Sequence, residues 1–360
     1  MATLIYNNLC LLSSRPRVKV LSLSRIVSSS EVEVSKRRVL KQVDEELSKG
    51  DERAALALVK DLQGKPGGLR CFGAARQIPQ RLYTLDELKL NGIETRSLLS
   101  PVDETLGSIE RNLQLAAIVG GVSAWNVFGF NPQQILYLSL ALLFLWTVDS
   151  VSYNGGVGSL VLDTIGHTFS QKYHNRVIQH EAGHFLIAYL VGILPKGYTL
   201  TSFEALKKEG SLNVQAGTAF VDFEFLEEVG PLSKEIGMIY HESHRLILVK
   251  YQLRLNISSQ TLNRFSCIAL AGVATEYLLY GYAEGGLADI NKVPHNSAQL
   301  TASEIQKKAD SQVRWSLLNT VLLLRRHKGA RAKLAVAMTM GKSVGSCIDI
   351  IEDNIDDTDI

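Results

Sequence analysis

The segment Val177–Leu194 contains the residues whose types and spacing best fit catalysis. Its residues 180–184 read HEAGH, a match to the pattern H-E-x-x-H. Residues four apart on an α-helix project from one face, so His180 and His184 can bind one zinc ion through neutral imidazole rings. Glu181 would then lie beside an open coordination position, where it can take a proton from an activated water. The pattern predicts metal-dependent hydrolysis at a carbonyl group.

The residues around this pattern favour a buried helix. Nearly all other side chains in the segment are apolar, and Pro195 disfavours helical backbone at the residue before it, so we expect the helix to end at Leu194. Gly183 is a poor helix former, but it would let a second backbone approach the metal side. The alternative is a core helix whose two histidines only hydrogen-bond their neighbours. Because burying two imidazoles and a carboxylate without partners is costly, we favour metal binding.

A third protein ligand must come from elsewhere in the chain. Downstream, the apolar segment Asn263–Tyr280 is predicted to be one helix that ends at Gly281. Acidic residues and a histidine lie in and after this helix. Periodicity does not choose among the four candidates, which are Glu276, Asp289, His295 and Glu304.

Two blocks of this sequence resemble the zinc peptidase domain of FtsH proteases. The first is HEAGH within an apolar helix. The second is the pattern A-G-x-A-x-E-x-x-x-x-G at Ala271–Gly281, followed by a glycine-rich turn into Asp289. The resemblance covers about Val177–Ile351 and is nearest to plant plastid proteins called FtsH-like or stress-regulated.

The resemblance implies a helical zincin-type peptidase domain that hydrolyses peptide bonds of plastid proteins. It implies Zn²⁺ bound by His180, His184 and Asp289, with Glu181 as the catalytic residue. The expected fold class is mostly α (α+β), with a short strand region where apolar residues alternate in Gly217–Phe225. That strand either offers an edge to an extended peptide or covers the core.

The chain contains no G-x-x-x-x-G-K-[ST] phosphate-binding loop. The ATPase module that accompanies the peptidase domain in FtsH proteases is therefore missing from this sequence. An ATPase-bearing FtsH-type partner and an oligomer are both compatible with this reading. Two alternatives stay open: a non-catalytic, zinc-stabilised scaffold subunit of a plastid membrane protease or import complex, and another metal-dependent hydrolase such as an amidase.

Two apolar segments precede the peptidase region. Leu113–Phe130 is uncharged over 18 residues, and Ile135–Val148 is more apolar still. Each is long enough, or nearly so, to cross a bilayer as a helix, and Asn131-Pro132 predicts a turn between them. We expect a hydrophobic helical hairpin in the membrane, with one span or two protein-buried helices as alternatives. The glycine-containing stretch Val151–Gly166 is expected to be a flexible approach to the catalytic helix.

The first thirty residues have the composition of a transit peptide. No acidic residue occurs before Glu31, and arginines and lysine alternate with many serines. We therefore expect a chloroplast membrane protein, in the thylakoid or envelope, with its catalytic domain in the stroma. The net charge of +2 does not favour nucleic-acid binding, and the four cysteines form no C-x-x-C pair.

The predicted organisation has five parts. Residues 31–112 form a helical or mixed docking region without chemistry, in which Thr84 begins a helix. The final residues, from Glu352, are expected to be a frayed acidic tail. The parts are a transit peptide at 1–30, the N-terminal region at 31–112, the membrane hairpin at 113–150, the zinc peptidase domain at 151–351 and the tail at 352–360.

Overall fold

The structure is a computed structural model, and over the residues it describes the chain is mostly helical with one two-stranded antiparallel sheet. The described residues are 29–99, 104–129, 131–153, 155–210, 216–221, 259–285 and 302–360. Residues 1–28 of the predicted transit peptide, Asp289 and His295 lie outside these residues, whereas Ser29 and Ser30 begin a helix.

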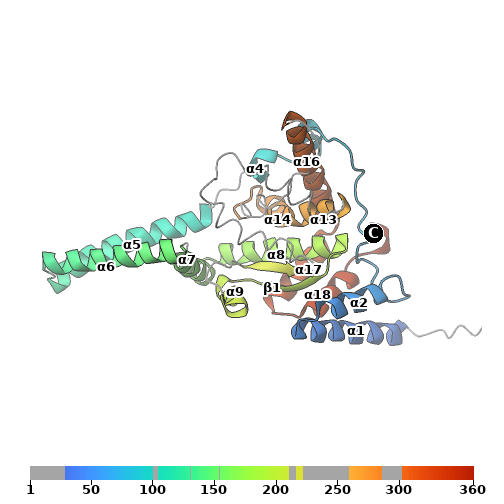
Figure 1. The fold of residues 1–360 in the computed structure, drawn as a ribbon, viewed down its shortest axis with the longest axis horizontal. Coiled ribbons are helices and arrows are strands. Elements are labelled where there is room, and N and C mark those ends of the chain that lie inside the picture. Colours follow the sequence, from blue (N-terminus) through green and yellow to red (C-terminus); the bar gives the residue numbers. More distant parts are fainter. Residues whose placement is uncertain are drawn as a thin grey trace, which may run out of the picture.

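Helix α8 (Gln171–Val191) runs through the middle of the body and is buried over most of its length (Figure 1). Ser170 caps its first turn with a side-chain hydrogen bond. The helix was predicted to extend to Leu194, and this end is wrong. Gly192 adopts a φ of 86°, and its N–H donates to carbonyl groups of the last helical turn. The helix therefore ends at Val191, and Pro195 does not determine its end.

Four helices from the later part of the chain surround α8. The helices α14 (Ala271–Tyr280) and α17 (Lys328–Thr339) pack along it. Two more, α13 (Ser259–Ala269) and α16 (Ala302–Arg326), pack on α14 and on each other. Their apolar side chains and those of α8 form one continuous core, which places the HEAGH face of α8 in the interior.

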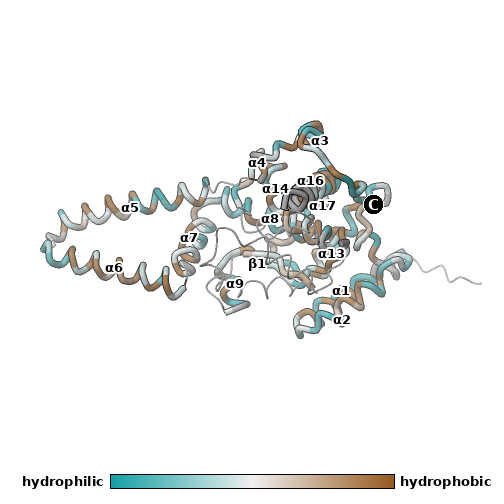
Figure 2. Tube along the Cα trace, turned by 45° about the horizontal axis from the view of Figure 1, so that its top comes forward, coloured by the Kyte–Doolittle hydropathy of each residue, from teal (hydrophilic) through white to brown (hydrophobic). Residues whose placement is uncertain are grey.

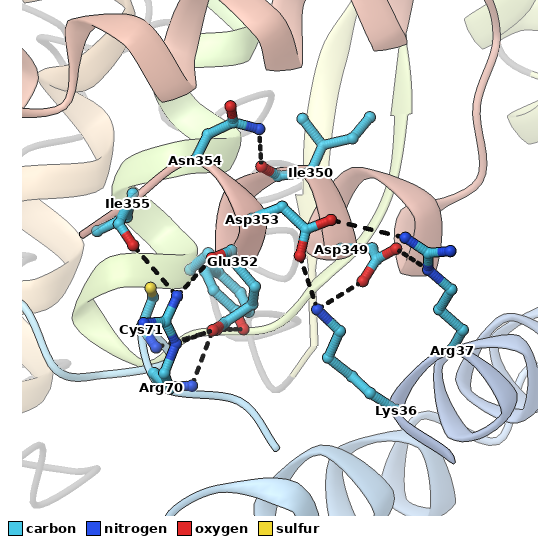
Figure 3. Close-up of polar contacts among 11 residues, drawn as sticks. Lys36, Arg37, Arg70, Cys71, Asp349, Ile350, Glu352, Asp353, Asn354 and Ile355 are labelled. Atoms are coloured by element: carbon cyan, nitrogen blue, oxygen red, sulfur yellow. Dashed lines mark hydrogen bonds and ion pairs between the residues drawn. The ribbon is translucent and has the colours of Figure 1, made fainter. Parts of the chain in front are cut away.

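The N-terminal helices belong to the same core. The helices α1 (Ser29–Lys49) and α2 (Glu52–Leu62) pack together, and α1 also packs on α18 (Val344–Asp353), the last α-helix of the described chain. Lys36 Nζ lies 2.8 Å from an Asp349 carboxylate oxygen and 2.9 Å from one of Asp353 (Figure 3). Segments from the two ends of the chain therefore support each other.

Short elements complete this side of the body. α3 (Leu85–Leu90) and α4 (Thr95–Leu99) follow a loop, and a 3-10 turn, η1 (Asp357–Asp359), ends the described chain. Thr84 begins α3 as predicted: its hydroxyl accepts from the Glu87 N–H, and the Glu87 carboxylate accepts from the Thr84 N–H at 2.8 Å.

Glu352 shows that the acidic tail is not frayed at its start. Its side chain is buried and accepts three hydrogen bonds, from the backbone N–H groups of Arg70 and Cys71 at 2.8 and 2.9 Å and from the Tyr189 hydroxyl at 2.6 Å (Figure 3). Ile355 is buried as well. The prediction of a frayed tail is wrong because this carboxylate joins the 70–71 loop to α8.

The strands lie beside α8. β1 (Pro195–Thr199) pairs with β2 (Gly217–Phe220), and β2 also contacts α8. The strand predicted at Gly217–Phe225 is confirmed as far as Phe220; Val221 is a buried turn residue, and residues 222–225 lie outside the described part of the chain. The short helix α9 (Ser202–Glu209) lies between β1 and β2 in the sequence.

Two long helices protrude from the body. The chain runs outward along α5 (Glu104–Phe128), reverses near Gly129 and returns along α6 (Pro132–Ser152), as Figures 1 and 2 both show. Among the described helices, α6 alone is long and apolar enough to cross a membrane, and none of its apolar window is buried. Its trace in Figure 2 is predominantly hydrophobic in colour.

A helix replaces the flexible approach that we predicted before α8. Residues Gly156–Phe169 form α7, which packs against α8, α5 and α6. Gly155 adopts a φ of 75° just before the helix. Asp149 at the end of α6 then accepts from the N–H groups of Val157 and Gly158, both at 2.9 Å. The glycines permit this sharp turn and do not loosen the segment.

The hydrogen bonds to Glu352 lead to a prediction about stability. Tyr189→Phe removes one donor from a buried carboxylate, so we expect the free energy of unfolding to fall by about 1.5–3 kcal/mol. Glu352→Gln should cost at least as much, because an amide cannot accept from all three donors. Urea unfolding of the detergent-solubilised full chain measures both. Tyr137→Phe, on the exposed face of α6, is the control, and an equal response of Tyr137→Phe and Tyr189→Phe would contradict the assignment.

Candidate metal centre

His180 and His184 lie side by side on one face of α8, as their spacing predicts. Their ring centroids are 4.7 Å apart and their Nε2 atoms 3.0 Å apart. Glu181 joins them in a buried cluster in which one ligand atom of each residue lies within 4.8 Å of the others. Among the described residues this is the one group of three such side chains that fits a metal ion.

The opposite nitrogen of each ring has an oxygen partner. His180 Nδ1 lies 2.7 Å from Glu276 Oε1, and His184 Nδ1 lies 2.8 Å from the carbonyl oxygen of Ile268. A backbone carbonyl accepts hydrogen bonds and cannot donate, so His184 Nδ1 must carry a proton. The same holds for His180 Nδ1 if the Glu276 carboxyl group is ionised.

The surroundings of Glu276 keep it ionised. Burial of this side chain opposes the charge, but the hydrogen bond with His180 lowers the pKa of Glu276 below its usual value. The Glu284 N–H, which donates to Glu276 Oε2 at 2.8 Å, and the charge of Arg176 act in the same direction. Glu276 therefore accepts from His180 Nδ1, behind the ring. Glu276 fixes the orientation of the His180 ring and does not belong to the group of side chains that could hold the metal.

These contacts determine what the two Nε2 atoms can do. In a neutral imidazole with its proton on Nδ1, Nε2 carries a lone pair. Two such lone pairs at 3.0 Å repel each other unless a cation lies between them. Two nitrogens on one tetrahedral zinc ion would be about 3.3 Å apart, given zinc–nitrogen distances of about 2.05 Å. The pair is close to the spacing that a zinc ion requires.

Two glycines allow α8 and α14 to come this close. A Cβ atom on Gly272 would lie 2.2 Å from His180 Nε2, so only glycine leaves room for the imidazole ring. A Cβ atom on Gly183 would lie 2.2 Å from Thr275 Oγ1 and 2.9 Å from the Ala271 carbonyl oxygen. The prediction that Gly183 admits a neighbouring backbone is confirmed.

The Ile268 contact coincides with a break that sequence analysis missed. The single helix predicted at Asn263–Tyr280 is two helices, α13 and α14, separated at Leu270, while Gly281 ends α14 as predicted with a φ of 83°. The Ile268 carbonyl accepts from His184, and the helical ladder resumes with Ala274 N–H donating to Leu270. The break lets a main-chain oxygen turn towards the histidine.

Arg176 is a second feature that the sequence patterns did not single out. This buried guanidinium lies one helical turn before His180 on α8. Its Nη1 is 2.9 Å from Glu284 Oε1 and its Nε is 3.5 Å from Glu276 Oε2. Arg176 lies in the polar first part of α8, just before the apolar segment Val177–Leu194, and no motif includes it.

Glu284 also connects this cluster to α5, one of the two protruding helices. Thr105, in the first turn of α5, donates its N–H to Glu284 Oε2 at 3.2 Å. A continuous series of polar contacts thus runs from α5 through Glu284, Arg176 and Glu276 to His180. The position of the candidate ligand depends on groups from four separate segments.

Glu181 is oriented by the sheet. Its Oε2 atom accepts from the Thr218 hydroxyl of β2 at 2.8 Å.

Two of the four candidate third ligands, Asp289 and His295, lie outside the described residues, and so does the side chain of Glu304. Their roles stay predictions.

Replacement of Gly272 tests the close packing. Gly272→Ala would force the His180 ring to move, so we expect zinc affinity to fall at least about tenfold, with unfolding easier by about 1–3 kcal/mol. Gly329→Ala, in α17, has open space around the added atom and should not weaken zinc binding. Competition with a chromophoric chelator measures affinity. Equal zinc affinity in Gly272→Ala and the unaltered protein would refute the packing argument.

The support behind His180 gives a second prediction. Glu276→Gln should lower zinc affinity about 10- to 100-fold, because a neutral amide orients the imidazole less firmly. Arg176→Met should have a smaller effect in the same direction, since it leaves the Glu276 hydrogen bond in place. Glu45→Gln, on the exposed side of α1, is the matched control. The same titration would contradict this role if Glu276→Gln and Glu45→Gln behaved alike.

Comparisons of the chain with protein-family models, with curated proteins and with solved structures give no match. The site is therefore interpreted from its own geometry and from the sequence resemblance described above.

Proposed function

We propose that this chain is a membrane-anchored, ATPase-lacking zinc endopeptidase that hydrolyses peptide bonds of plastid proteins. The observation that carries the proposal is the pair of Nε2 atoms of His180 and His184, held 3.0 Å apart beside the buried Glu181 carboxylate. Both Nδ1 atoms are engaged by oxygen acceptors. The metal, when bound, supplies a Lewis acid that polarises the substrate carbonyl and makes a water molecule more acidic.

Each residue of the site has a defined part in this reaction. His180 and His184 bind the ion, while Glu276 and the Ile268 carbonyl fix the orientation of their rings. Glu181 accepts the proton of the attacking water and then donates it to the amine that leaves. The family resemblance assigns the third ligand to Asp289.

The position of β2 supports a polypeptide substrate. β2 pairs with β1, and Thr218 of β2 contacts the Glu181 carboxylate. Extended backbone therefore lies beside the candidate catalytic carboxylate. This arrangement favours peptide bonds over small amides as the substrate.

The apolar helix α6 supports membrane anchoring. It projects from the body with its large apolar side chains exposed, which is costly in water and favourable in a bilayer. A transit-peptide-like N-terminus supports a location in a chloroplast membrane, with the body in the stroma. Substrates would be unfolded or loosely held segments of membrane or stromal proteins, delivered with or without an ATPase-bearing FtsH-type partner.

One observation favours a second candidate function. The sequence lacks a phosphate-binding loop, so the chain contains no motor of that type that could unfold substrates. A zinc-stabilised scaffold subunit of a membrane protease or import complex would need only the metal and the fold. Full rescue of a null line by the Glu181→Gln form would favour the scaffold, and failed rescue would favour the enzyme.

Substitution of Glu181 tests the catalytic proposal. Glu181→Gln removes the proton acceptor but neither histidine, so zinc should remain bound while cleavage of an unfolded protein falls at least about 100-fold. His184→Ala should lose both zinc and activity. Metal analysis and a casein-cleavage assay on the purified full chain measure the two properties.

Glu45→Gln is the control for the loss of one carboxylate. A chelator should abolish cleavage in the unaltered protein, and added Zn²⁺ should restore it. Cleavage that persists at the original rate in Glu181→Gln would eliminate the endopeptidase proposal.

A further inference from the structure

The exposed apolar surface of α6 does not end where the helix ends. Val151 and Tyr153 are exposed at its last turn, and the exposed side chains of Val157 and Val161 continue the series along α7. Phe169, at the far end of α7, is 83% exposed. A phenylalanine this accessible is unusual in a water-facing helix end.

Helix α9 extends this surface. It packs against α7, and its Phe203 side chain is 60% exposed. The attachment is specific, because Asp163 of α7 accepts from the Ser202 N–H of α9 and from the Tyr173 hydroxyl of α8, each at 2.8 Å. The helices α7, α8 and α9 are therefore fixed to one another where α5 and α6 leave the body (Figure 1).

The rest of the described surface does not show this grouping. Outside α5, α6, α7 and α9, exposed large apolar side chains occur one or two at a time on separate elements, as is usual for soluble surfaces. They are Val34, Leu82, Leu85, Leu90, Leu279, Val336 and Met340. Helix α8, which packs against α7, contributes no exposed large apolar side chain.

One lysine of α9 is placed to meet an anionic headgroup, in a helix that carries two lysines and two glutamates. Lys207 is exposed one turn after Phe203, so both side chains project from the same side of the helix. The nearby Glu204 carboxylate is turned back and accepts from the Leu200 N–H at 2.9 Å. An aromatic ring beside a lysine is the pairing found where helices lie at lipid headgroups.

We infer that α7 and α9 form an interfacial face, defined by Val157, Val161, Phe169 and Phe203, that lies on the membrane entered by α6. The inference rests on the membrane anchoring in the proposed function, and it goes beyond it by fixing how the body meets the lipid. The occupant is the bilayer itself, because the face is continuous with the helix that enters it.

This placement limits which substrates the site can reach. Helix α8 begins directly after α7, and His180 lies roughly 15 Å along it from Ser170. The candidate metal centre would thus be held within a few nanometres of the headgroups. Segments of membrane proteins just outside the bilayer are the substrate class that such a position favours.

Lipid quenching of fluorescent labels tests the interfacial face. In a Cys10→Ser background, where the buried Cys71, Cys267 and Cys347 react slowly, an NBD label is placed at single cysteines. Phe169→Cys and Phe203→Cys report on the face, Leu142→Cys on α6, and Val336→Cys on a water-facing position with comparable exposure to Leu142. The full chain is reconstituted into phosphatidylcholine–phosphatidylglycerol vesicles that carry shallow or deep doxyl-lipid quenchers.

We expect deep quenching at position 142, shallow quenching at positions 169 and 203 at least about twofold above position 336, and weaker quenching at 203 in neutral vesicles. Quenching at 142 with positions 169 and 203 matching 336 would overturn the interfacial face while leaving the anchor intact. A lack of quenching at 142 as well would overturn the anchoring proposal itself. Protection of 169 and 203 from aqueous iodide without lipid quenching would show that protein and not lipid covers the face, and would also reject the inference.

Discussion

The hydrogen bond between His180 Nδ1 and the buried Glu276 carboxylate is the interaction on which the candidate site depends. It fixes the tautomer of the imidazole and directs Nε2 towards His184. A buried carboxylate is stable only with compensation, which the Glu284 N–H and the Arg176 guanidinium provide. The orientation of the His180 ring is thus determined by residues that lie behind it, away from the Nε2 atoms.

Close packing is the second constraint. At Gly183 and Gly272 the helices α8 and α14 meet so tightly that a methyl group would overlap a side chain or the backbone of the other helix. This contact presses the His180 ring against α14 and brings the Ile268 carbonyl to His184. Packing and polar contacts therefore specify the same ring orientations.

Local patterns predicted the parts of this arrangement that local chemistry controls. The apolar segment around HEAGH is a buried helix, Gly281 ends α14, and Thr84 begins α3. The failures have physical causes of longer range. The helix predicted to end at Leu194 ends earlier because Gly192 adopts a left-handed conformation, and the break at Leu270 accompanies a contact between Ile268 and a histidine far away in sequence. No periodicity could reveal Arg176 or Thr218, since their partners come from other elements.

The contacts of Glu352 have a consequence for how the protein is made. Its carboxylate meets Tyr189 of α8 across 163 positions of sequence. During synthesis, and again during any passage through a translocation pore, the chain around Tyr189 emerges long before Glu352 does. The central helix can form early, but its far end gains its last support only when α18 arrives. A chain that is not yet complete would therefore carry His180 and His184 on a helix that lacks this support.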